Sequence, residues 1–121
     1  GISRDLPVQK ESSQFEDLSE VLREIDKHLD QALTVKFLAG KSGLSPFQLD
    51  QRIRSLFGMT TSQYIIRRKI DRACHLLERT DEMLSSIALE CGYRDQSAFT
   101  RQFRQSVGMP PGAYRESRGG H

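Results

Sequence analysis

Residues 46 to 57 carry side chains that could hydrogen bond to the base edges of double-helical DNA. If Leu49 faces a core, a step of 100° per residue along a helix places four side chains on the opposite, outward side. These four are Phe47, Gln51, Arg54 and Ser55. A guanidinium suits guanine O6 and N7, an amide suits adenine, a hydroxyl suits either base, and an aromatic ring can contact a thymine methyl group or a sugar.

A second helix, marked by Phe99 and Phe103, presents the same kind of surface about fifty residues later. Its outward side chains are Ser97, Arg101, Arg104 and Gln105. The inward positions of the two helices are Leu49, Ile53 and Leu56 in the first and Phe99, Phe103 and Ser106 in the second. Because the two outward sets occupy equivalent places, we expect two similar reading surfaces. Phe47 leaves an alternative open, since its ring could instead pack against a turn or a neighbouring helix.

A helix-turn-helix pattern surrounds the second surface. Ile87, Ala88 and Cys91 form a short apolar stripe, and Gly92 stands where the chain must turn with a positive φ. Tyr93 fills the angle between the helices, and the small Ala88 lets them approach closely. Asp95 is suited to cap the second helix.

The same pattern occurs earlier in the chain, which indicates an internal repeat. A shift of 49 superimposes Val35, Leu38, Ala39 and Gly43 on Leu84, Ile87, Ala88 and Gly92. After one inserted residue, a shift of 50 superimposes Leu49, Ile53, Arg54, Gly58, Met59 and Tyr64 on Phe99, Phe103, Arg104, Gly108, Met109 and Tyr114. Two copies are too few for a solenoid, so we expect two helix-turn-helix units in one chain.

The remaining elements follow in order, and all of them are helical or irregular. Apolar residues from Phe15 to Leu29 predict a first amphipathic helix, Thr34 and Ser45 are suited to cap the next two, and Thr60 with Gln63 has capping-box spacing. The predicted organisation is a linker or tail (1–14), a first unit (15–59), a joining helix (60–80), a second unit (81–118) ending in a short helix through Tyr114, and a tail (119–121). The predicted fold is all-α, with the two units joined by a long central helix.

Charge is distributed unevenly along the 121 residues, whose net charge is +2. Residues 1–33 hold 4 Lys and Arg against 8 Asp and Glu, whereas residues 34–121 hold 14 against 8. The repeated part would therefore attract a polyanion. A basic cluster on the joining helix, Arg67, Arg68, Lys69 and Arg72, adds to this potential, although an ordinary solvated face would look the same.

Other classes of function find little support in the composition. The chain contains none of the common hydrolase, zinc-protease or phosphate-loop motifs, so we predict no enzyme and no cofactor. His28, His75 and His121 lack partners at metal-ligand spacing, so we predict no metal site, and Cys74 and Cys91 fit buried positions in a reducing cytoplasm. Apolar runs are too short for a membrane helix.

From about residue 20 to 118, the chain resembles the DNA-binding domain of the AraC/XylS family of bacterial transcription regulators. The residues that carry the resemblance are the Ala39 to Ser45 turn, the Gly58 to Tyr64 joint, Arg68, Ala73, Leu76, Leu77, Ile87, Ala88, Gly92, Tyr93, Asp95, Ser97, Phe99, Arg101, Phe103, Gly108, Pro110, Pro111, Tyr114 and Arg115. The resemblance implies about seven helices in two lobes, with the third and sixth helices in two successive major-groove segments of DNA.

The resemblance also implies site residues. The family's base-reading places fall on Phe47, Asp50, Gln51, Gln96, Ser97, Thr100 and Arg101, and we assign phosphate contacts to Ser45, Arg54, Arg68 and Arg104. The first unit departs from the family pattern at Gln51, Arg52 and Ile53. Asp50 could accept a hydrogen bond from cytosine N4 or pair with Arg54 one turn away.

We therefore predict a sequence-specific double-stranded DNA-binding domain of a transcription regulator, with activation as its role and RNA polymerase as a further partner. The alternative is a protein-interaction module that keeps the fold without specific DNA binding. The first residue is not Met, and family members carry an effector-binding or dimerising domain upstream, so we expect a fragment of a longer protein. The expected location is the bacterial cytoplasm, at the nucleoid.

Overall fold

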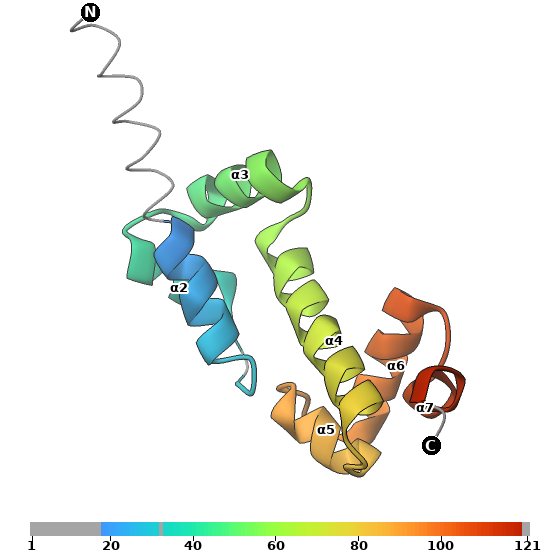
Figure 1. Ribbon diagram of the computed structural model, residues 1–121. Helices are drawn as coiled ribbons and strands as arrows, with labels where there is room; N and C mark the ends of the chain where they lie inside the picture. Colours follow the sequence, from blue (N-terminus) through green and yellow to red (C-terminus); the bar gives the residue numbers. More distant parts are fainter. Residues whose placement is uncertain (1–17, 32, 120–121) are drawn as a thin grey trace, which may run out of the picture.

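The computed structural model describes residues 18–31 and 33–119, and all regular structure in them is helical (Figure 1). A first helix over residues 18–27 precedes the labelled helices. These are α2 (Val35–Ser42), α3 (Pro46–Phe57), α4 (Thr61–Arg79), α5 (Leu84–Glu90), α6 (Gln96–Val107) and α7 (Pro111–Gly119). The predicted all-α fold is confirmed, whereas Phe15 and the segments 1–14 and 120–121 lie outside the described residues. None of the described helices combines the length and apolar composition that crossing a membrane requires.

Local capping signals begin the helices where the sequence predicts. The Ser45 hydroxyl accepts from the Gln48 N–H at 3.1 Å, and the Ser45 N–H donates to Gln48 Oε1 at 3.0 Å. Thr60 and Gln63 form the same reciprocal pair at the start of α4. Asp95 accepts from the backbone N–H three residues further on at 2.8 Å. Each cap satisfies backbone donors that an α-helix leaves unpaired in its first turn.

Two separate cores hold the helices together. The first core consists of aliphatic residues from the first helix and the turn after it, from α2 and α3, and from the start of α4: Leu18, Val21, Ile25, Leu29, Leu38, Ala39, Leu49, Ile53 and Ile65. The second core contains aromatic rings and comes from the rest of α4 with α5, α6 and α7: Ile70, Ala73, Leu77, Ile87, Ala88, Cys91, Phe99, Phe103 and Tyr114. Each predicted helix-turn-helix unit therefore has a core of its own.

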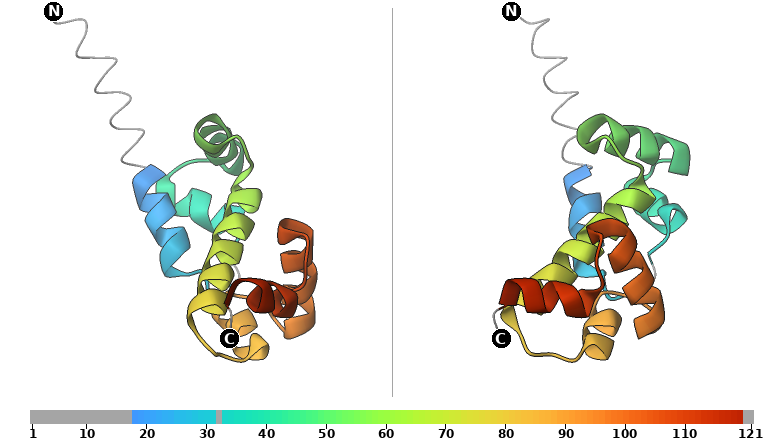
Figure 2. Two further views of the ribbon diagram at one scale, coloured as in Figure 1. Left: turned by 45° about the vertical axis from the view of Figure 1, so that its right-hand side comes forward. Right: turned by 90° about the vertical axis from the view of Figure 1, so that its right-hand side faces the viewer.

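Helix α4 belongs to both cores and connects the two lobes. Ile65 packs in the first core, and Ile70, about one turn further on, packs in the second. Figures 1 and 2 show the first helix, α2 and α3 around the N-terminal half of α4, with α5, α6 and α7 around its other half. Its 19 residues give it a length of roughly 28 Å.

Helix α7 continues beyond the predicted end at Tyr114, as far as Gly119. The Tyr114 hydroxyl donates to the Glu78 carboxylate of α4, and Arg115 donates to the Leu77 carbonyl. These contacts dock α7 on α4, so the helix does not fray at Tyr114 and the prediction of its end was wrong.

Candidate nucleic-acid interface

Helix α3 has one buried side and one exposed side, as its periodicity predicts. Leu49 and Ile53 are fully buried, whereas Gln51, Arg54 and Ser55 are exposed. Leu56 was predicted to face inward, and this was wrong, because its side chain is 42% exposed. The core contacts of α3 end with Ile53, so the last turn of the helix projects beyond the first core.

Phe47 lies at the start of the exposed side of α3. Its side chain is 69% exposed, which excludes the alternative that the ring is buried against a turn or against α4. A large apolar ring at such a place is available to a partner. Because α3 begins at Pro46, Phe47 also stands beside the backbone N–H groups of the first helical turn, which attract anions.

Helix α6 presents the matching surface in the second lobe. Phe99 and Phe103 are fully buried. The exposed side chains of the helix are Gln96, Ser97, Arg101, Arg104, Gln105 and Ser106. Ser106 was predicted to face inward, and this was wrong, because its side chain is exposed. Thr100, predicted to read a base, is half-buried.

The two surfaces have the same framework. Both helices contain 12 residues, begin after a side-chain cap at Ser45 or Asp95, and end at a glycine with a positive φ, Gly58 at 71° or Gly108 at 95°. The fifty-residue shift therefore relates whole helices, and it relates the four predicted outward residues of each one to one. The exposed pairs are Phe47 with Ser97, Gln51 with Arg101, Arg54 with Arg104, and Ser55 with Gln105.

Asp50 makes a contact that the sequence did not predict. Its Oδ1 accepts from the backbone N–H of Thr61 at 3.0 Å, which joins α3 to the first turn of α4. The side chain and backbone N–H of Thr61, with a smaller effect from Arg54, hold the pKa of the Asp50 carboxyl below its ordinary value. This contact with α4 replaces the predicted pairing with Arg54, for which the structure contains no ion pair.

Arg68, which was predicted to contact a phosphate, forms an ion pair within the protein. Its Nε donates to Asp26 Oδ1 at 2.9 Å and its second terminal nitrogen to Asp26 Oδ2 at 3.4 Å. Asp71 lies 3.7 Å from the remaining nitrogen. Asp26 belongs to the first helix, so this ion pair joins that helix to α4. The prediction from sequence did not account for this partner.

The predicted basic cluster on α4 does not form one exposed face. Arg67 is exposed, whereas Arg68, Lys69 and Arg72 are half-buried. The Lys69 ammonium lies 5.2 Å from the centre of the Tyr93 ring, and burial lowers the pKa of Lys69. This part of α4 therefore supports the fold more than it offers free positive charge.

Arg115 is a residue whose role the sequence did not reveal. Its guanidinium donates to the carbonyls of Leu77 at 3.2 Å, Thr80 at 3.1 Å and Glu82 at 2.7 Å. These bonds fix the end of α4 and the loop that leads to α5. Tyr114 and Arg115 belong to the family signature, but the signature does not indicate which residues Arg115 contacts.

Comparisons with known proteins agree with this geometry. Residues 38–117 match the family model described as a helix-turn-helix domain. The chain is 33% identical over 98 residues to the regulatory protein SoxS of Escherichia coli (strain K12), covering 81% of this chain and 92% of SoxS. It is 32% identical over 110 residues to the MmsAB operon regulatory protein of Pseudomonas aeruginosa, covering 91% of this chain but 35% of that protein. The chain therefore spans about a third of the length of the MmsAB regulator.

A solved structure extends the comparison to three dimensions. The DNA-binding domain of the global transcriptional factor AdpA, crystallised in complex with a target DNA, has a TM-score of 0.77 and 34% sequence identity. The match covers 83% of this chain and 90% of the AdpA domain. Helices α3 and α6 both fall within the part of the chain that the family model matches.

Proposed function

The chain belongs to the AraC/XylS family of helix-turn-helix transcription regulators, and we propose that it binds duplex DNA by placing α3 and α6 in two successive major-groove segments. The single observation that carries the proposal is the pair of exposed faces on two equally long helices, each begun by a side-chain cap, that are joined by α4. Successive major-groove segments lie about one helical turn apart, roughly 34 Å. A connecting helix of roughly 28 Å is suited to that separation.

Base reading in the second segment falls to Gln96, Ser97 and Arg101, with Thr100 at the edge of the surface. A guanidinium can donate two hydrogen bonds to guanine, and the amide and hydroxyl can each contact adenine or other base edges. In the first segment, Phe47 contacts a thymine methyl group or a sugar and Gln51 reads a base. We assign Asp50 the role of holding α3 against α4, since its carboxylate is already hydrogen bonded there.

Phosphate contacts fall at the ends and flanks of these helices. The Ser45 hydroxyl, which accepts a bond within its capping box, still has its proton to donate. Arg54 and Arg104 occupy equivalent exposed places, each one turn beyond the central reader. Phosphate contacts give affinity and register, whereas base contacts give sequence preference.

Selection of bound sequences from a random duplex pool tests this assignment. We expect one protein on each site of about two helical turns, with two separated groups of preferred bases. Gln51→Ala should relax preference in one group and Arg101→Ala in the other. Preference for a single short group, or for none at all, would contradict reading by two helices, and absence of DNA binding would favour the protein-interaction module.

We assign the whole protein a role in activating transcription in the bacterial nucleoid, with RNA polymerase as a partner. Relatives at 28% and 29% identity carry the names HTH-type transcriptional activators RhaS and RhaR. We also assign an effector or dimerisation domain to a longer parent protein, because the chain spans about a third of several relatives. Transcription in vitro from a promoter carrying the selected site, with and without the chain, tests activation; a fall in transcript would instead indicate repression.

A further inference from the structure

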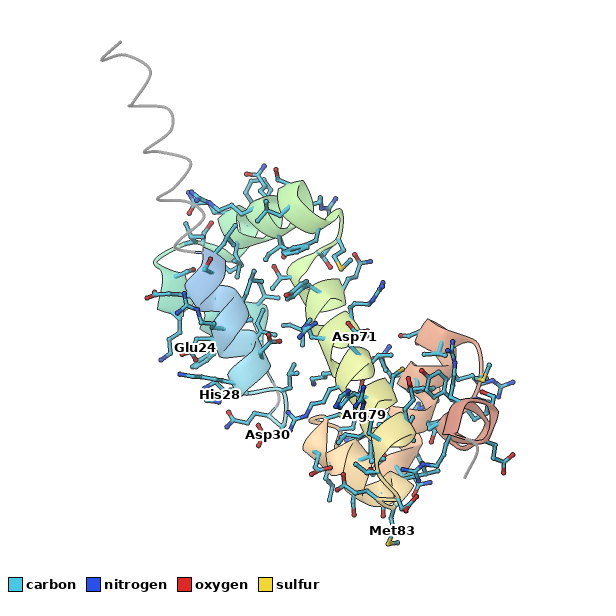
Figure 3. All side chains as sticks on the ribbon, in the orientation of Figure 1. Glu24, His28, Asp30, Asp71, Arg79 and Met83 are labelled. Atoms are coloured by element: carbon cyan, nitrogen blue, oxygen red, sulfur yellow. The ribbon has the colours of Figure 1, made fainter. Side chains whose placement is uncertain are left out.

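The end of the first helix and the residues that follow it make two contacts, one with the middle of α4 and one with the second unit. The first is the ion pair of Asp26 with Arg68, which reaches the middle of α4. Figure 3 shows Asp71 on the same part of α4, and Asp71 Oδ2 lies 3.7 Å from Arg68. The guanidinium is therefore held between a carboxylate of the first helix and a carboxylate of α4.

The second contact is between backbones. Gly92, in the turn between α5 and α6, has a φ of 84°, and a Cβ atom placed on it would lie 2.2 Å from the Leu29 carbonyl oxygen. The same atom would lie 3.0 Å from the Gln31 carbonyl oxygen. No side chain fits in that space, so the turn of the second unit rests directly on the segment that follows the first helix.

A half-buried lysine completes this junction. Lys69 Nζ would lie 3.1 Å from the same Cβ position on Gly92, and it lies over the ring of Tyr93. Lys69 comes from α4, Tyr93 from the start of the second unit, and the two carbonyls from the first lobe. Three parts of the chain therefore meet at one point away from the axis of α4.

We infer that residues 26–31 form a brace that fixes the two reading units relative to each other and thereby sets the spacing between the DNA segments that the chain accepts. The spacing part of the inference rests on the proposed two-segment reading. A connection through α4 alone would let each lobe pivot about the helix. A second contact at a distance from that axis removes the pivot, because the lobes are then held at two points.

Spacing on DNA is a sensitive measure of such a brace. One inserted base pair moves the second segment by about 3.4 Å and rotates it by roughly 35° about the DNA axis. A rigid pair of reading helices cannot follow that rotation without losing contacts, whereas a pivoting pair can follow part of it. The brace therefore predicts strong discrimination against altered spacing.

Asp26→Ala is the variant that tests the brace, because it removes the ion pair from an exposed helical position where alanine is well tolerated. We expect the preference for the selected site over sites with one base pair inserted or removed to fall about two- to fivefold, the range for a partly exposed pair. Glu20→Ala is the matched control, since it removes the same charge from the same helix far from the junction. Exchanging the partners with Asp26→Arg and Arg68→Asp together should restore part of the preference, because Asp71 remains beside the new carboxylate at position 68.

A distance measurement on the free protein separates the brace from the DNA proposal. Spin labels at Ser55→Cys on α3 and Gln105→Cys on α6, with Cys74 replaced by alanine, report the relation of the two helices. We expect one narrow distance distribution that broadens in Asp26→Ala and in Gly92→Ala but not in Glu20→Ala. Unchanged widths together with unchanged spacing preference would overturn the brace. Widths that depend on Asp26, in a protein without any spacing preference, would support the brace and contradict the two-segment reading.

Discussion

The two helix-turn-helix units expose equivalent helix positions but rest on different interiors. Helices α3 and α6 agree in length, in having a side-chain cap at the start and in ending at a glycine with a positive φ. Their supports differ: α3 rests on Leu49 and Ile53 in an aliphatic core, and α6 rests on Phe99 and Phe103 in an aromatic one. The two units therefore share helix length and a terminal glycine, whereas the packing beneath each helix differs.

The aromatic support is a continuous chain of rings. The Phe99 and Phe103 ring centres lie 5.7 Å apart, and Phe103 lies 5.5 Å from Tyr114, each pair near an edge-to-face arrangement. Tyr93 continues the chain at 5.4 Å from Phe99. Such pairs add to the free energy gained from burial alone. We therefore expect the second lobe to lose more stability than the first when an equivalent core residue is truncated.

Phe103→Ala and Ile53→Ala test this expectation at equivalent, fully buried positions. We expect Phe103→Ala to lower the free energy of unfolding by about 3–5 kcal/mol and Ile53→Ala by about 2–5 kcal/mol, with the first loss the larger. Urea unfolding followed by circular dichroism measures both. Equal losses, or a larger loss at Ile53, would show that the aromatic chain adds nothing to the second lobe.

Arg115→Ala sharpens the comparison, because the equivalent residue of the first lobe is Ile65, a buried apolar side chain. Loss of a charged donor to three carbonyls should cost about 1.5–3 kcal/mol of stability. Arg101→Ala, which changes an exposed arginine of the same lobe, should leave the melting temperature nearly unchanged. Comparable melting temperatures for the two variants would mean that the Arg115 hydrogen bonds contribute little.

Arg101→Ala and Gln51→Ala compare the two central readers. Arg101→Ala should weaken binding to the best site by about 1–3 kcal/mol and relax preference at one base position. Gln51→Ala should act on the other DNA segment with a smaller loss, because an amide makes neutral hydrogen bonds and charge-assisted bonds are stronger. Binding to single-base variants of the site measures both. A uniform loss over all sequences would instead place the changed residue at a phosphate.

Asp50→Asn tests the hydrogen bond from the Thr61 N–H to Asp50, which joins α3 to α4. The equivalent residue in α6 is Thr100, which makes no such bond in the described structure. Thr61 lowers the pKa of Asp50 in the folded protein. The ionised Asp50 carboxylate therefore stabilises the fold above the unfolded pKa, near 3.9. This stabilisation is lost as the pH falls through the lower pKa of the folded protein. We expect wild type to be more stable than the variant by about 0.5–1.5 kcal/mol at pH 7. The difference should shrink below about pH 4. Asp30→Asn is the control, and a difference independent of pH would exclude the charge as its cause.

Arg54→Ala and Arg104→Ala should give the smallest and most similar effects, because they occupy equivalent flanking places. Each should reduce the salt dependence of binding by about one ion and weaken specific and scrambled duplexes alike. Titrations at several salt concentrations measure this. If Arg104→Ala relaxed base preference while Arg101→Ala lowered all affinities equally, the exposed face of α6 would be rotated from the one we assign.

Local signals in the sequence predicted most of the fold. The caps at Ser45, Thr60 and Asp95 and the positive φ of Gly92 depend on residues within one or two turns of each other, so their spacing can be read directly. With Leu49 and Phe99 placed in the core, periodicity likewise identified the buried residues Ile53 and Phe103. It failed at helix ends, as with Leu56, because a helical pattern gives the side of a residue but not how far the neighbouring core extends.

Contacts between distant residues could not be predicted in this way. Asp26 and Arg68 are 42 residues apart, and each looks like an ordinary surface charge in its own helix. The carboxylate of Asp50 had plausible partners among bases and a neighbouring arginine, and only the path of the chain brings Thr61 to it. Among the predicted site residues, Asp50 and Arg68 are the two for which these contacts show a partner within the protein.

The covalent order of the two unequal units has a consequence for promoters. A symmetric dimer reads a palindrome and looks the same from either end of its site. Here Phe47 and Gln51 stand in one unit and Ser97 and Arg101 in the other, so a bound molecule has a head and a tail. If the site were inverted, the bound molecule would be reversed along the DNA, and α7 would face the DNA on the other side of the site. Gene control by this chain should therefore depend on which strand of the promoter carries the site.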